Sequence, residues 1–405
     1  MKPTAHPNAA RDKSAPGKAG DADPPYFATN TVRLNLRQWA FVGGVILAIV
    51  LATPCLWKHL ERFDIGTDYR IPYDLSKDYW LYQRRMERLD NPEQVVVIGD
   101  SVVWGEFVLP DGTLPHFLDR ETDATNRFVN GGVNGLFPLA LEGLIRSYGG
   151  PIHDRKVILH CNLLWMSSPK ADLQTAKEEK FNHPKLVPQF SPRIPCYRAD
   201  ANVRLSNVLE RRVPFFGWTE HLQTAYFNQN SLIDWTLADD GGLPPKFPNT
   251  YKNPVSQITM VVPAAPEDDP LRGPASPRHK PWSTTGEGTS RFEWVDLDTS
   301  LQWGAFQRLV NLLRERGNDI FVVVGPLNEH TMIPENRAVF HQLVDGVREW
   351  LDAGQVPNFA PDVLPSDLYG DTSHPLTEGY ALLAKQLVEE RRFKEWLEAG
   401  AESSP

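Results

Sequence analysis

Short apolar runs alternate with longer amphipathic stretches along much of the chain. Four runs rich in β-branched residues are predicted strands, at 95–98, 127–130, 156–161 and 319–325. Four stretches with apolar residues at helical spacing are predicted helices, at 137–148, 299–316, 335–353 and 376–398. Continuous apolar runs are typical of strands buried on both faces, and strands that alternate with helices indicate a covered parallel sheet. The pattern therefore predicts an α/β protein.

The N-terminal part has a different pattern. Residues 1–37 contain few large apolar residues and are predicted to be a disordered tail. The run from Trp39 to Trp57 has no charged residue, and about 20 apolar residues suffice to span a bilayer as a helix. Trp39 and Trp57 flank the segment where interfacial aromatics are expected. A soluble buried helix is disfavoured because the segment has no polar face, and a cleaved signal peptide because no small-x-small site follows. Residues 38–57 are predicted to be an uncleaved signal-anchor helix, with the tail inside and the rest outside the cytoplasm.

The remaining chain divides into a lead-in, a domain and an insertion. Residues 58–93 are polar and aromatic and are predicted to be a membrane-proximal linker with one short helix around 76–89. Residues 94–398 hold the α/β pattern, which is interrupted at about 163–297 by a stretch far longer than an ordinary crossover. This insertion is aromatic and helical up to about 240, and rich in Pro, Gly and Ser over 241–290, where a poorly ordered loop is expected.

Composition narrows the functional classes. The chain has 42 Lys and Arg against 51 Asp and Glu, a formal net charge of −9, which disfavours nucleic-acid binding. Hydrophobic residues make up 41%, which is ordinary for a globular protein and excludes wholesale disorder and a multi-span membrane protein. The three cysteines form no disulfide framework, and whether Cys161 and Cys196 pair is left open.

Two motifs contain the residue types of nucleophilic catalysis. Gly99-Asp100-Ser101 directly follows the first predicted strand, at the sheet edge where α/β proteins build sites. Asp371 precedes His374 by three residues, close enough for its carboxylate to orient the imidazole. Taken alone, Ser101 could simply begin a helix, and Asp371 could cap one.

Two further motifs could supply hydrogen-bond donors to an oxyanion. The stretch from Asn130 to Gly135, Asn-Gly-Gly-Val-Asn-Gly, follows the second strand, and its glycines allow close backbone approach. Asn162 follows the third strand. The alternatives are an ordinary glycine turn and a loop-capping Asn. Residues 328–330 follow the fourth strand and could line the same pocket.

Together these four stretches resemble the blocks of the SGNH, or GDSL-type, hydrolase superfamily. The resemblance covers about 94–162 and 298–398. It implies a three-layer, flavodoxin-like parallel sheet, with Ser101 as nucleophile, His374 as base and Asp371 as its orienting acid. It also implies that Ser101 N–H, Gly135 N–H and the Asn162 side chain hold the oxyanion. The sequence has no His-Glu-x-x-His motif, no clustered carboxylates and no phosphate-loop Lys after the glycine turn, so no metal and no cofactor are expected. The sequence departs from the family pattern at His160, Asn134 and Leu163, where Gly, Ser and Asp are common.

The expected function is that of a membrane-anchored serine esterase or O-acyltransferase. Because the anchor would hold the enzyme near envelope material, its expected partners are the lipid bilayer and acylated carbohydrate, with O-acetyl groups favoured. The alternative is a non-catalytic accessory protein that binds glycan or a membrane-bound O-acyltransferase. A lipase or thioesterase acting on long acyl chains is a third option.

Overall fold

The computed structural model describes residues 34–63, 65–89, 91–238, 252–262 and 280–399. The chain divides into two units, Met1–Val50 and Leu51–Pro405. The predicted tail lies almost wholly outside the described residues. Of the predicted loop at 241–290, only 252–262 and 280–290 are described.

A five-stranded sheet forms the centre of the second unit. Its strands are β1 (Val95–Ile98), β2 (Phe128–Asn130), β3 (Lys156–Cys161), β4 (Asp319–Val324) and β5 (Asn358–Phe359). All pairings are parallel, and the strand order is β2-β1-β3-β4-β5. The predicted α/β class and parallel sheet are confirmed. The two-residue β5 was not predicted, because a run that short has no pattern of its own.

Helices precede and follow these strands. They are α2 (Tyr79–Met86), α3 (Ser101–Trp104), α4 (Leu114–Glu121), α5 (Pro138–Tyr148), α6 (Ala201–Arg212), α7 (Pro214–Tyr226), α8 (Leu232–Leu237), α9 (Leu301–Glu315), α10 (Pro334–Ala353), α11 (Thr377–Glu389) and α12 (Arg391–Glu398). The predictions at 137–148, 299–316 and 335–353 are confirmed. The single helix predicted at 376–398 is wrong, because Glu390 has extended backbone and its side chain caps α12 by accepting from Arg392 N–H.

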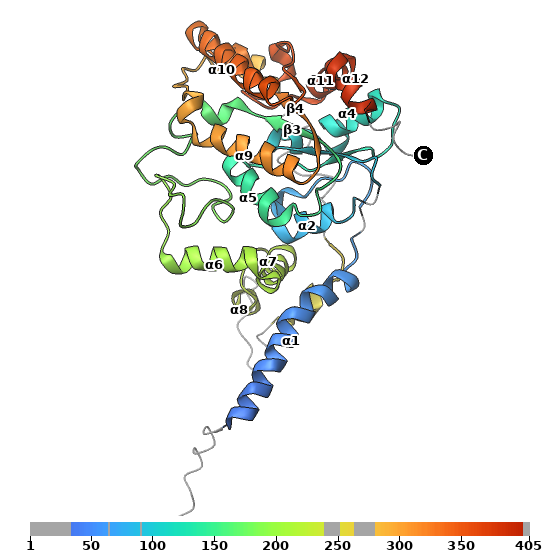
Figure 1. The fold of residues 1–405 in the computed structure, drawn as a ribbon, viewed down its shortest axis with the longest axis vertical. Coiled ribbons are helices and arrows are strands. Elements are labelled where there is room, and N and C mark those ends of the chain that lie inside the picture. The colour runs from blue at the N-terminus through green and yellow to red at the C-terminus, as the bar shows by residue number, and fades with distance from the viewer. Residues whose placement is uncertain (1–33, 64, 90, 239–251, 263–279, 400–405) are drawn as a thin grey trace, which may run out of the picture. The chain divides into compact units, whose positions relative to one another are not determined.

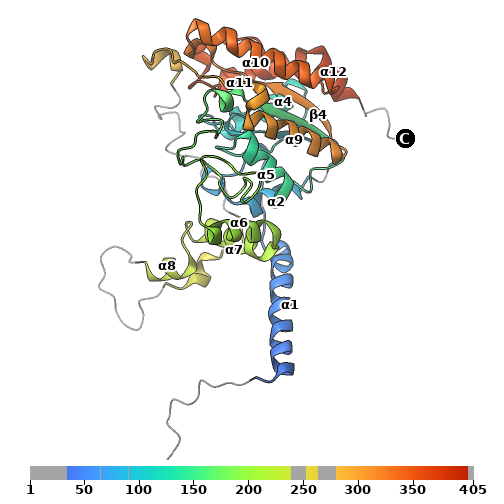
Figure 2. The same cartoon turned by 60° about the vertical axis from the view of Figure 1, so that its left-hand side comes forward.

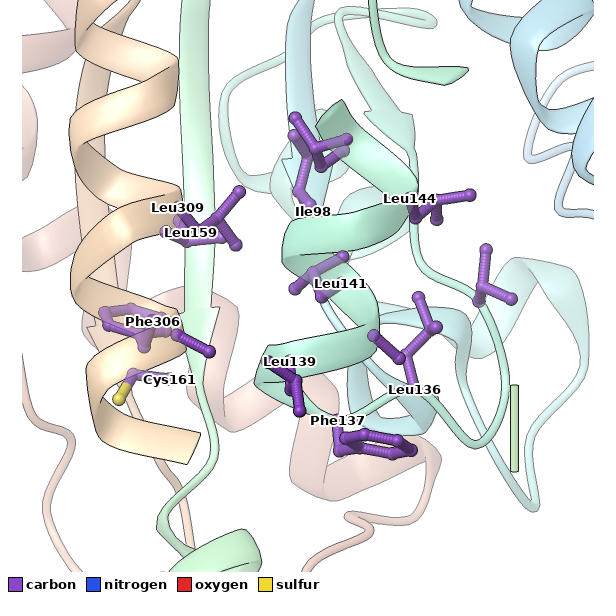
Figure 3. Close-up of a cluster of buried hydrophobic side chains, with 14 of the residues drawn as sticks. Ile98, Leu136, Phe137, Leu139, Leu141, Leu144, Leu159, Cys161, Phe306 and Leu309 are labelled. Atoms are coloured by element: carbon purple, nitrogen blue, oxygen red, sulfur yellow. The ribbon is translucent and has the colours of Figure 1, made fainter. Parts of the chain in front are cut away.

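The sheet is covered on both faces. Successive strand residues point to opposite sides, so Val96 and Ile98 join one core cluster while Val95 and Val97 join the other. Helices α5 and α9 pack on the first face, and α4, α11 and α12 on the second (Figure 1). Figure 3 shows apolar side chains of α5 and α9 in one cluster with Ile98 of β1 and Leu159 of β3. Because the buried strands all run parallel, their carboxyl ends lie together at one edge of the sheet.

The lead-in at 58–93 is part of this folded unit. Leu81, Tyr82 and Met86 of α2 are buried in the same core cluster as β1 and α5. The segment predicted as a linker thus packs against the sheet domain.

The insertion contains α6, α7 and α8, which lie together in Figure 2. A buried polar cluster joins α7 to the lead-in. His221 Nδ1 lies 2.6 Å from Asp78 Oδ2, and its Nε2 lies 2.8 Å from Glu61 Oε1. Tyr226 donates to Glu61 at 2.6 Å, and Arg84 binds the other Glu61 oxygen. We call these five residues the Glu61 cluster.

Helix α1 (Leu36–Leu60) belongs to both units. Within the part of the chain that the structure describes, it is the one helix long and apolar enough to cross a membrane. Its length of 25 residues exceeds the predicted span of 38–57 at both ends.

Candidate active site

The sequence motifs meet at the carboxyl edge of the sheet. Strand β1 lies between β2 and β3, so the chain leaves β1 toward one neighbour and later returns to the other. Such a reversal of strand order opens a crevice beyond the strand ends, where α/β proteins bind ligands. Ser101 follows β1, and Asn162 follows β3. These two residues therefore lie on either side of the reversal.

A continuous hydrogen-bonded chain links Ser101, His374 and Asp371. Ser101 Oγ lies 2.8 Å from His374 Nε2. The other ring nitrogen, Nδ1, lies 2.8 Å and 2.9 Å from the two carboxylate oxygens of Asp371. Because a carboxylate only accepts, Nδ1 carries the proton and Nε2 is left to accept from the serine hydroxyl. Side chains 273 positions apart in the sequence are thus joined in one hydrogen-bonded line.

The loop before α11 holds Asp371 in place. The backbone N–H groups of Ser373 and His374 donate to Asp371 Oδ1 at 2.8 Å and 2.9 Å. Asn328 donates from its side chain to the Asp371 carbonyl at 3.1 Å. Asn328, considered from sequence as a pocket residue, is fully buried and supports this loop. Its neighbour Glu329 pairs with His341 instead.

The electrostatics favour a charged form of the pair. Burial alone would lower the pKa of His374, but the Asp371 charge and hydrogen bond outweigh it, so the pKa lies above the ordinary histidine value. Asp100 and Glu106 act in the same direction. Burial would raise the pKa of Asp371, and the His374 charge and the hydrogen bonds it receives lower it. The protonated form of the His374 ring is therefore stabilised.

Asp100 is a structural carboxylate. It accepts from Val102 N–H at 3.0 Å, from the Asn162 amide at 2.7 Å and from Trp165 Nε1 at 3.1 Å, and it lies 3.2 Å from His160 Nδ1. Burial would raise its pKa, but His160 and the Asn162 amide lower it to about 2. Asp100 thereby connects the start of α3 to the end of β3 through hydrogen bonds. His160 is one of its partners.

Asn162 lies where an oxyanion donor is expected, and its side chain is already engaged. Its Oδ1 accepts from Leu164 N–H at 3.0 Å, while its amide nitrogen donates to Asp100. An amide nitrogen has two hydrogens, and the bond to Asp100 uses one of them.

The glycine turn lies against the helix that begins with Ser101. Asn130 donates to the Val103 carbonyl at 3.0 Å and accepts from Gly132 N–H. A Cβ on Gly132 would lie 2.4 Å from Trp104 N, so only glycine permits this approach. Gly135 has φ +74°, a left-handed conformation that favours glycine. The turn is thus built by Asn130 and Gly132, and Gly135 follows at its end.

Two residues next to the serine motif were not identified from the sequence. Phe107 presents its ring edge-on to His374 at 5.4 Å between centroids, and its φ of +70° is unusual for a bulky residue. Glu106 accepts from the Asn134 amide. Their position just after Gly105 is the only signal that the sequence offered.

A polar cavity of about 140 Å³ adjoins the glycine turn. Its walls come from the lead-in, the turn and the insertion, and are formed by Tyr73, Asp74, Ser76, Lys77, Asn134, Asn182, His183 and Gln229. Asn182 abuts the turn, because a Cβ on Gly135 would lie 2.6 Å from its amide nitrogen. The insertion therefore contributes to the surroundings of the predicted oxyanion turn.

His183 fixes one wall of this cavity. Burial lowers its pKa to about 4, so the ring is neutral. Its Nε2 donates to the Asn134 carbonyl at 2.8 Å, which leaves Nδ1 to accept from Tyr79 at 2.9 Å. No sequence signal marked His183 or Asn182, because both lie far along the chain from the motifs.

Other sequence candidates are placed as follows. Cys161 and Cys196 are free thiols and both are buried. Among the residues that the structure describes, no group of three or more His, Cys, Asp or Glu side chains could hold a metal ion.

A comparison of the sequence with models of known protein families gives no match, and neither does a comparison with curated proteins. The interpretation of the site therefore rests on the residues and their geometry.

Proposed function

We propose that the protein is a serine esterase or O-acyltransferase of the SGNH type. The observation that carries this proposal is the hydrogen-bonded chain from Ser101 through His374 to Asp371. A serine hydroxyl becomes a useful nucleophile only when a positioned base removes its proton. Here the base is in contact with the hydroxyl, and a carboxylate fixes its tautomer.

The sheet supports the same proposal. The order β2-β1-β3-β4-β5 is that of flavodoxin-like doubly wound sheets. The order of the four motifs along the chain, and their position at the strand ends, agree with the SGNH pattern. Ser101 lies at the reversal of strand order, where this architecture places its ligands.

In the proposed reaction, His374 Nε2 takes the Ser101 proton as Oγ attacks the ester carbonyl carbon. The C–O bond to the alcohol then breaks, and the imidazolium returns its proton to that leaving alcohol. Water or a sugar hydroxyl next gives its proton to His374 and attacks the acyl-serine. The bond between the acyl carbon and Ser101 Oγ then breaks, and the imidazolium returns its proton to Oγ, which releases the acyl product and restores both residues. Hydrolysis and transfer differ only in that second nucleophile.

The carbonyl oxygen becomes negatively charged during each attack. The free hydrogen of the Asn162 amide and the backbone N–H groups of Ser101 and Gly135 are the proposed donors to it. Such preorganised donors commonly contribute about 10²–10³ each to turnover.

We propose O-acyl groups of envelope glycans, with O-acetyl favoured, as the substrate class. The cavity beside the glycine turn contains one carboxylate, one ammonium group and several amides and hydroxyls. Formal charges cancel, and the mixture of donors and acceptors suits a neutral polyhydroxyl group better than a long acyl chain. Helix α1 would hold the enzyme at the membrane, with the α/β domain on the extracytoplasmic side.

A serine-reactive fluorophosphonate probe tests the chemistry. We expect the full-length protein in detergent to be labelled and Ser101→Ala to be unlabelled. Ser373→Ala is the matched control, because Ser373 Oγ also lies near the ring of His374, at 3.4 Å from Nδ1, but on the wrong nitrogen. Folded wild-type protein that stays unlabelled would favour the accessory-protein alternative.

Hydrolysis profiles test the substrate class. The full-length protein should release acetate from O-acetylated oligosaccharides faster than it cleaves esters of long acyl chains. A preference that increases with acyl length would instead favour a lipase or thioesterase.

A further inference from the structure

The short helix α8 carries an exposed apolar surface. Leu232, Ile233 and Leu237 are 48%, 69% and 58% exposed, and Val255 of the neighbouring turn is 72% exposed. We call these four residues the α8 surface. Soluble surfaces seldom gather such side chains without a partner.

Helix α8, which carries this surface, packs near the C-terminal end of α1. Trp57 of α1 packs edge-on against Trp218 and Tyr226 of α7, with ring centroids 5.6 Å and 6.3 Å apart. Trp57 also packs against the small core of Tyr226, Phe227 and Trp235. Trp235 is the inward residue of α8, so the α8 surface lies on the outer side of the helix that packs around Trp57.

The position of Trp57 along α1 indicates at which level of a membrane α8 would lie. The uncharged run ends at Trp57 and is followed by Lys58 and His59. A bilayer core of about 30 Å accommodates about 20 residues of helix, and tryptophan favours the interface between lipid and water. If α1 spans the membrane, Trp57 therefore lies at the interface, and α8 lies beside it.

We propose that the α8 surface inserts into the interfacial layer of the phospholipid bilayer that α1 crosses. The occupant of this apolar surface is thus lipid, because the helix packed behind it enters the membrane at the same level. Lys252, whose ammonium lies 5.1 Å from the centre of the Trp235 ring, is placed beside the headgroups. The domain then has two membrane attachments, which restrict its swing about α1 and fix how the carboxyl edge of the sheet faces the membrane.

Site-specific fluorescence on the full-length protein in phospholipid nanodiscs tests this proposal. In a Cys55→Ser background, Ile233→Cys is labelled with an environment-sensitive fluorophore, since Cys161 and Cys196 are buried. Emission at position 233 should shift to the blue and be quenched by brominated lipid. Val339→Cys on α10 is the matched control: it is 39% exposed and apolar, and Figures 1 and 2 place α10 far from α8. The fluorophore at position 339 should show the emission of a water-exposed label.

The other outcomes are equally informative. A water-like signal at position 233 would overturn the proposal, and so would a blue-shifted signal that brominated lipid leaves unquenched, since protein would then cover the surface. Leu47→Cys reports on α1 itself. An unquenched label there would refute the membrane span and the proposal together, while fluorophosphonate labelling of Ser101 would still stand as evidence for the esterase.

Discussion

Two histidines of this protein are each held by carboxylates, and they differ in what they can do. His374 has Asp371 on one ring nitrogen and a neutral hydroxyl on the other, and its side chain is 14% exposed. His221 has Asp78 on one nitrogen and Glu61 on the other, and its side chain is fully buried.

The difference lies in the partners of the two ring nitrogens. Both ring nitrogens of His221 face acceptors, so it must hold both protons, and Asp78 and Glu61 raise its pKa to about 9 against the effect of burial. His374 has only one carboxylate partner and keeps a nitrogen free to accept a proton. A base needs an unsatisfied acceptor, whereas a second carboxylate turns the same side chain into a fixed cation.

Removing each ring should have opposite consequences. We expect His374→Ala to lower kcat by about 10⁴-fold or more and to destabilise the fold less than His221→Ala does. His221→Ala should destabilise the fold by about 3–5 kcal/mol, because it leaves Glu61 and Asp78 buried with one partner fewer. Ester hydrolysis and urea unfolding of the full-length protein in detergent measure the two effects. The comparison fails if folded His221→Ala protein loses activity as His374→Ala does.

Asn162 tests whether the site donates to an oxyanion. We expect Asn162→Ala to lower kcat by about 10²–10³-fold. The control is Trp165→Phe, which also removes a donor to Asp100 but has no proposed part in the reaction. Equal losses in both variants would mean that Asn162 acts only by holding Asp100.

The two pKa shifts predict opposite dependence on pH. Because only neutral His374 accepts a proton, kcat/KM should increase with pH up to a pKa above the ordinary histidine value. His221 binds its proton more tightly in the folded state than in the unfolded state. Its contribution is therefore complete below pH ~6.5 and is lost as pH increases toward 9.

Because the pKa increases from 6.5 to about 9, this loss amounts to roughly 3 kcal/mol, at about 1.36 kcal/mol per pH unit. Unfolding curves between pH 6 and 9.5 measure it. His374 also has a raised pKa and therefore contributes to the dependence of stability on pH. The same unfolding curves measured on His374→Ala lack that contribution. A stability that is flat over this range in that variant would show that His221 is not the fixed cation described here.

The sequence indicated the site of Ser101, His374 and Asp371 but not the Glu61 cluster. The Ser101 motif is recognisable because it follows a predicted strand, and the His374 motif because it precedes a predicted helix. In a parallel sheet the carboxyl ends of the strands lie at one edge, so such motifs are expected to meet there. Nothing local marks Glu61 or His221, which are 160 positions apart and meet only because the insertion packs on the lead-in. Neither the partners of Asp100 nor the break at Glu390 could be read from periodicity, since each depends on tertiary contacts.

The smallest expected effect compares one hydrogen bond in each region. Tyr226 donates to the Glu61 carboxylate and Tyr380 donates to the Val102 carbonyl, both at 2.6 Å. Bonds to charged groups contribute about 1.5–3 kcal/mol and neutral ones about 0.5–1.5 kcal/mol, so Tyr226→Phe should destabilise the protein more than Tyr380→Phe. Urea midpoints of the two variants measure this order. Because Val102 follows Ser101 on α3, only Tyr380→Phe should also lower kcat. If Tyr226→Phe lowered kcat instead, the Glu61 cluster would be coupled to the reaction, and the two histidines would not be independent.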